Sequence, residues 1–96
     1  MNPEIQSPLQ AQSLPRLRAD IQVKTVQGKV VAVDTGSGDY HVFNEVGGLI
    51  CRGLADGRAR ARLVAEITST FAVPADRAAY DLDRFLESLR QKKLLG

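Results

Sequence analysis

The sequence is poor in the side chains that build catalytic and metal sites. Its 96 residues include one histidine, one cysteine and no tryptophan. A lone cysteine closes no internal disulfide and builds no thiolate cluster, and a metal site needs three or four suitably spaced ligands. A nucleophilic pair of His41 and Cys51 is disfavoured, because helical periodicity places Cys51 beside Ile50 as a structural thiol. We therefore expect a protein that is not an enzyme, has no catalytic or metal-binding residues and needs no cofactor.

Long apolar runs and a strong charge of one sign are missing as well. No segment approaches the roughly 20 apolar residues that cross a bilayer, and the first residues lack the basic-then-apolar order of a secretion signal. We therefore expect a cytoplasmic protein with no membrane partner. The net charge is +2, far from the dense basic surface of a nucleic-acid-binding protein, so no nucleic-acid partner is expected. The alternating Arg58, Arg60 and Arg62 leave a winged-helix DNA-binding regulator open as an alternative.

Hydrophobic patterning divides the chain into an N-terminal arm and one folded domain. Residues 1–15 hold three of the four prolines and show no apolar periodicity, so a flexible arm is expected there. Alternation of apolar and polar residues over 17–25 predicts a first strand. The β-branched run 29–34 and the run 39–43 predict a second and a third strand, separated by glycine-containing turns. These three segments predict an antiparallel meander.

Three helices are expected after the strands. Asn44 has the side chain of a helix N-cap, and apolar residues at helical spacing follow it as far as Asp56-Gly57. A second amphipathic pattern covers 59–71, and a third begins after Pro74 and continues to about Gln91. The apolar Leu94-Leu95 is expected to fold back on the domain. The predicted fold class is α+β, with an N-terminal three-stranded antiparallel sheet followed by three helices.

A set of motifs in a characteristic order occupies three segments, Gly38 to Ile50, Leu54 to Gly57, and Asp81 to Leu89 with Leu94-Leu95. Taken together, these segments resemble the PqqD family of leader-peptide recognition proteins, and the resemblance covers about residues 15–96. The family features are a tyrosine strand that ends in an apolar-Asn pair, an Asp-Gly after the first helix, and a last helix of the Asp-x-x-x-Phe-Leu-x-x-Leu type. Two departures are Cys51, where the family commonly has tryptophan, and the glycines that begin the first helix.

The resemblance implies a winged helix-turn-helix-like domain over residues 16–96, whose third strand is an open edge. A precursor's leader would add to that edge as an antiparallel strand and place side chains in the groove between the third strand and the third helix. If Leu82, Phe85 and Leu89 face the core, one flank of the third helix can line the groove; ordinary packing is equally open for Tyr80. The expected peptide-binding residues are Asp39, Tyr40, His41, Val42 and Phe43 on the strand, and Arg77, Tyr80, Asp81 and Arg84 on the helix.

The implied partners are a precursor peptide and the enzyme that processes it. The short chain and polar arm favour a free-standing recognition protein of a lasso-peptide pathway, which hands the leader to a leader peptidase. One alternative is delivery of a precursor to a radical-SAM enzyme, as in quinone-cofactor biosynthesis. Another is a subunit that stabilises its enzyme without touching the substrate. The oligomeric state stays open, because an edge strand also permits dimerisation or strand exchange.

Overall fold

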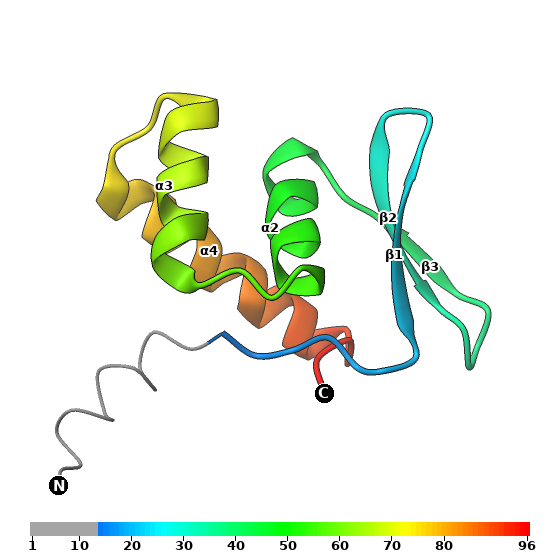
Figure 1. The fold of residues 1–96 in the computed structure, drawn as a ribbon. Coiled ribbons are helices and arrows are strands. Elements are labelled where there is room, and N and C mark those ends of the chain that lie inside the picture. The colour runs from blue at the N-terminus through cyan, green and yellow to red at the C-terminus, as the bar shows by residue number, and fades with distance from the viewer. Residues whose placement is uncertain (1–13) are drawn as a thin grey trace, which may run out of the picture.

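The computed structural model describes residues 14–96, in which three strands precede three helices (Figure 1). This order and the antiparallel pairing of the strands confirm the predicted α+β class. Residues 1–13, most of the predicted arm, lie outside the described residues. The elements are β1 (Ile21–Val26), β2 (Lys29–Asp34), β3 (Tyr40–Val42), α2 (Glu45–Ala55), α3 (Arg60–Phe71) and α4 (Ala75–Gln91).

The strands form one sheet in the order β1-β2-β3, so β1 and β3 are its two edges. Gln27 and Gly28 connect β1 to β2 with φ angles of 52° and 80°, the pair of left-handed residues that a tight hairpin turn uses. The register places Ala32 of β2 opposite His41 of β3. Figure 1 shows α2 between this sheet and α3, with α4 crossing behind the other helices.

The core lies where α2 packs against one face of the sheet and against the other two helices. A Cβ at Gly48 of α2 would lie 3.0 Å from the Val30 Cβ on β2, and a Cβ at Gly53 would overlap the Leu63 side chain on α3. Glycines weaken an isolated helix, but here they let α2 approach an element on each side. The side chains with no solvent exposure are Ala32, Ile50, Cys51, Leu63, Ala78, Leu82 and Leu89.

The first strand is shorter than predicted, because residues 17–20 do not join the sheet. Leu17 instead forms an isolated antiparallel bridge with Leu95, and the Arg18 amide donates to the Leu94 carbonyl at 2.9 Å. A turn at residues 19–20 then redirects the chain into β1. Alternation over 17–25 correctly indicated the strand that begins at Ile21, but it revealed neither the turn at 19–20 nor the separate pairing of Leu17 with the C-terminal tail. The expected fold-back of Leu94 and Leu95 is confirmed by the same bridge.

The Arg18 side chain ties this segment to the sheet and to the C-terminal tail. Its guanidinium lies 3.0 Å from Asp20 Oδ1 and 2.7 Å from Asp34 Oδ2, and it donates to the Lys93 carbonyl at 2.7 Å. The hydrogen bond from Arg18 holds the pKa of Asp34 below its ordinary value. Leu14, at the end of the predicted arm, packs against the core together with Leu17.

Candidate functional site

The open edge of β3 presents backbone groups that no strand of residues 14–96 pairs with. The Phe43 amide donates to the Val30 carbonyl at 3.1 Å, and the Asp39 carbonyl accepts from the Asp34 amide at 2.8 Å. Along an antiparallel pair, successive residues point their backbone groups alternately toward and away from the partner strand. Asp39, His41 and Phe43 therefore bond to β2, and Tyr40 and Val42 direct two N–H and two C=O groups outward. The predicted strand 39–43 is correct in place, although β3 itself covers only Tyr40–Val42.

The side chains of β3 alternate between two faces of the sheet. His41 and Phe43 point toward the helices and are half-buried. Tyr40 and Val42 point to the opposite face, where they are 68% and 54% exposed. We call this opposite side the outer sheet face and define its apolar patch as Val26, Val31, Val33, Tyr40 and Val42.

A groove of about 320 Å³ separates β3 from the second half of α4. Its apolar floor is the Phe43–Phe85 pair, whose rings meet edge to face with centroids 5.3 Å apart. The Phe85 ring lies so close to α2 that a Cβ at Gly47 would be 2.7 Å from its Cε1 atom. Asn44 caps α2 as predicted, through a 2.8 Å bond from the Gly47 amide to its Oδ1 atom. The groove is lined by His41, Val42, Phe43, Asn44, Phe85, Ser88 and Lys92.

The helix residues predicted for the site lie on α4 but do not line this groove. Arg77 and Asp81 form an ion pair one helical turn apart, with Nε and Oδ1 separated by 3.4 Å. The Arg84 guanidinium lies over the Tyr80 ring at 5.6 Å and donates to the Tyr80 hydroxyl at 3.1 Å. Tyr80 is 55% exposed, so core packing is not its role. These four residues extend the flank of α4 beyond the N-terminal end of the groove.

Sequence reasoning missed Phe85, Ser88 and Lys92 as groove residues. Phe85 was expected in the core, and the structure shows it half-buried, packed on the core with one part facing the groove. Residues at i, i+3 and i+7 share one stripe of a helix, so the spacing of these three side chains was a usable signal. The helical pattern alone did not show that this stripe faces β3.

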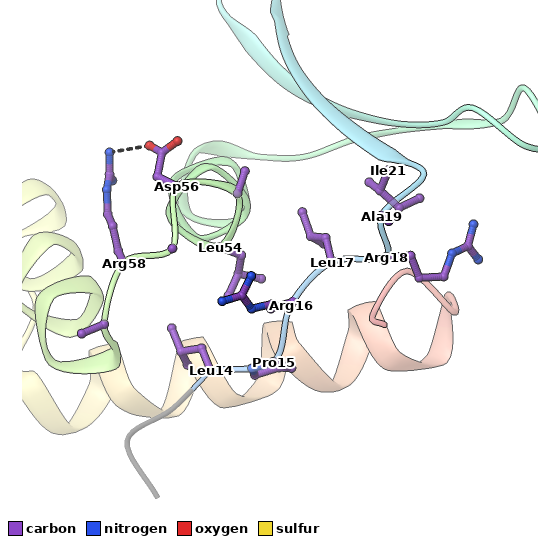
Figure 2. Close-up of a pocket in the computed structure, with 13 residues that line it drawn as sticks. Leu14, Pro15, Arg16, Leu17, Arg18, Ala19, Ile21, Leu54, Asp56 and Arg58 are labelled. Atoms are coloured by element: carbon purple, nitrogen blue, oxygen red, sulfur yellow. Dashed lines mark hydrogen bonds and ion pairs between the residues drawn. The ribbon is translucent and has the colours of Figure 1, made fainter. Parts of the chain in front are cut away.

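A second, larger hollow of about 830 Å³ lies between the segment 14–19 and the end of α2. Figure 2 shows this segment passing Leu54, with the Asp56–Arg58 ion pair on the far side. Arg58 also pairs with Glu66 at 3.0 Å. The Asp56-Gly57 motif at the end of α2 lies on this hollow, and the lining combines apolar side chains with charges that are mostly paired.

The three alternating arginines that left DNA binding open each face a carboxylate. Arg58 pairs with Asp56 and Glu66, Arg60 lies 2.7 Å from Asp83, and Arg62 lies 3.5 Å from Glu66. Their charges are therefore compensated within the domain and do not form a basic surface.

Cys51 is fully buried, and burial raises the pKa of its thiol to about 11. A thiol with such a pKa stays protonated at neutral pH and is a poor nucleophile. This agrees with its expected structural role.

Within residues 14–96, no three His, Cys, Asp or Glu side chains gather as a metal ion would need, and no helix is long and apolar enough to cross a membrane.

Comparison with known proteins finds one family and two similar solved structures. The sequence profile of the family described as coenzyme PQQ synthesis protein D (PqqD) matches residues 29–95. Lasso peptide synthetase B1 complexed with the leader peptide is 30% identical, with a TM-score of 0.74 over 84% of this chain and 95% of the other. TbiB1 in complex with the TbiA(beta) leader peptide is 25% identical, with a TM-score of 0.74 over 83% and 93%. No curated protein matches the chain.

Proposed function

This chain belongs to the PqqD family, and on that premise we propose that it binds the leader of a ribosomally made precursor peptide by strand addition to β3. The observation that carries the proposal is the open edge of β3 beside a groove. Both similar structures hold a leader peptide, which supports the same ligand class here. The domain itself performs no chemistry under this proposal and presents the peptide to a processing enzyme in the cytoplasm.

The edge and the groove have separate tasks in this binding mode. Tyr40 and Val42 offer four outward backbone groups, and each hydrogen bond contributes about 1 kcal/mol net. Backbone bonds hold any peptide in extended form, whereas pockets for alternate side chains distinguish one sequence from another. Leader side chains on the helix-facing side of the added strand would enter the groove above Phe43 and Phe85. The flank formed by Arg77, Tyr80, Asp81 and Arg84 would contact residues of the leader beyond the groove.

We propose a leader peptidase of a lasso-peptide pathway as the enzyme that receives the peptide. The outer sheet face supports an enzyme contact, because Tyr40 and Val42 are each more than half exposed there and pair with Val33 and Val31. Val26 is 52% exposed on the same face, opposite Lys29 at the end of β1. Clustered exposed apolar side chains are typical of protein interfaces. A leader strand added to β3 would widen this face, so the enzyme would meet the loaded protein over a larger surface. A radical-SAM enzyme is the alternative recipient, and it would receive the leader bound to β3 in the same way.

The test of strand addition places proline on either edge of the sheet. Val42→Pro removes an outward N–H without breaking a bond to β2, and edge strands accept proline at such positions. Thr25→Pro is the matched control, because the Thr25 amide points outward from β1 at the opposite edge. We expect Val42→Pro to weaken binding at least tenfold, measured by calorimetry with the leader of the precursor encoded beside this gene.

The two proline variants distinguish pairing of the leader with β3 from pairing with β1. Wild-type affinity in Val42→Pro, with the fold intact by circular dichroism, would show that the leader does not pair with β3. Loss of binding in Thr25→Pro alone would place the leader on β1. A wild-type protein that binds no leader would refute the proposed function.

A further inference from the structure

The groove beside β3 has an apolar end and a cationic end. Phe43 and Phe85 form the apolar end. Ser88 on α4 and Lys92 at its C-cap follow Phe85 by one and two helical turns. The Lys92 Nζ atom lies 3.4 Å from Ser88 Oγ. No aspartate or glutamate is among the lining residues, so a positive charge faces the groove without a negative one.

Lys92, the C-cap residue of α4, has no carboxylate partner in the described part of the chain, whereas two arginines on the helix do. Arg77 pairs with Asp81, and Arg90 pairs with Glu87 at 2.6 Å. Within residues 14–96, no carboxylate oxygen lies within ion-pair distance of Lys92. Among the described residues, its polar side-chain contact is the neutral Ser88 hydroxyl, which a negatively charged ligand can share or replace.

The spacing of the groove fits side chains on one face of an extended peptide. Side chains at i and i+2 of a strand point to the same side and lie about 7 Å apart. From Phe85 to Lys92 the helix axis rises about 10 Å, and the Lys92 side chain folds back toward Ser88, which shortens that span. A peptide side chain placed over the two phenyl rings would therefore have its i+2 neighbour within reach of Lys92.

We propose that Lys92 is a specificity residue, and that the groove selects leaders with an apolar side chain and, two residues away on the same face, an aspartate or glutamate. This inference rests on the proposed function and names the peptide chemistry that the same site prefers. The apolar side chain covers the Phe43–Phe85 floor. The carboxylate accepts a charge-assisted hydrogen bond from Lys92, which is stronger than a bond between neutral groups.

The experiment measures leader binding to wild-type protein, Lys92→Gln and Lys92→Glu, with Lys93→Gln as the matched control. Lys93 is the next residue, is exposed and does not line the groove. We expect about tenfold weaker binding for Lys92→Gln, which corresponds to about 1.4 kcal/mol, and a larger loss for Lys92→Glu. Lys93→Gln should bind as wild type does. Each acidic leader residue is also replaced singly by its amide.

One amide replacement should weaken wild-type binding about tenfold and have no further effect in Lys92→Gln. Changing that same leader acid to lysine should restore affinity to Lys92→Glu. Equal binding by wild type and Lys92→Gln, while Val42→Pro abolishes it, would overturn the specificity inference and leave strand addition standing. A leader that binds tightly without any acidic residue would overturn it too. Absence of binding to the wild-type protein would refute the proposed function itself.

Discussion

Replacing Gly47 by alanine should damage the groove more than it damages the fold. The new Cβ would lie 2.7 Å from Phe85 Cε1 and 3.3 Å from Cδ1, whereas carbon atoms in contact prefer about 3.5–4.0 Å. The ring edge must therefore move by about 1 Å, away from its edge-to-face contact with Phe43. Losing that contact would destabilise the fold by about 0.5–1.5 kcal/mol. Replacing a helical glycine by alanine would stabilise it by about 1 kcal/mol.

These opposing terms predict a change of less than about 1 kcal/mol in the free energy of unfolding for Gly47→Ala. Leader affinity should fall about tenfold, because an apolar anchor worth roughly 2 kcal/mol loses part of its contact surface. Gly48→Ala is the matched control. Its Cβ would meet the Cβ and Cγ2 atoms of Val30, both at 3.0 Å, and Val30 Cβ cannot move without the β2 backbone.

Gly48→Ala gains the same helix stability, but overpacking against Val30 costs about 1–3 kcal/mol, so the free energy of unfolding should fall by up to about 2 kcal/mol. Leader affinity should be unchanged at temperatures where the protein is folded. Urea denaturation gives the stabilities, and calorimetric titration with the leader gives the affinities. Wild-type affinity in Gly47→Ala would show that the Phe85 ring is not part of the binding site. Equal losses of affinity in both variants would show a general effect of packing around α2.

Three further results are expected. Cys51 should resist iodoacetamide at pH 8 in the folded protein and react fully in urea, since burial raises its pKa to about 11; rapid labelling of native protein would contradict its burial. Val26→Glu should slow leader cleavage by the peptidase yet leave leader binding intact, and equal cleavage rates would exclude the outer sheet face as the enzyme contact. Arg18 lowers the pKa of Asp34, so this pair stabilises the fold above the ordinary aspartate pKa of about 3.9 and loses that effect as pH falls through the lower folded value. In Arg18→Gln, the free energy of unfolding measured by urea denaturation should therefore decrease less as the pH is lowered than it does in wild type. An equal decrease in both proteins would refute the contribution of the Arg18–Asp34 pair.

The strands and helices were largely predictable because their signals are local. Helical spacing of apolar residues located α4 within one residue, and Asn44 marked the start of α2 through its own side chain. The partner of Leu17 was not predictable, since alternation carries no information about a strand contributed by the C-terminal tail.

The strand that we propose binds the leader was predicted from family-like residues, whereas the opposite wall of the groove was not. Ser88 and Lys92 face β3 because α4 crosses behind α2, and that crossing depends on long-range packing such as Phe85 against Gly47. In the sequence, Gly47 was only one of the glycines that begin the first helix, a departure from the family pattern. The structure shows that Gly47 lies against the Phe85 ring and so affects the shape of the groove.

The shortness of β3 limits how much of a bound peptide is immobilised. Three residues of strand span about 10 Å. Most of a precursor would therefore remain unbound on either side of the segment that pairs with β3. Backbone bonds alone are satisfied equally when a peptide slides by two residues, because they do not depend on side chains. The Phe43–Phe85 floor would select one of these frames and thereby set how many residues lie between the held segment and the bond that the enzyme cuts. In this way the groove would determine the position of the cleaved bond relative to the bound segment of the leader.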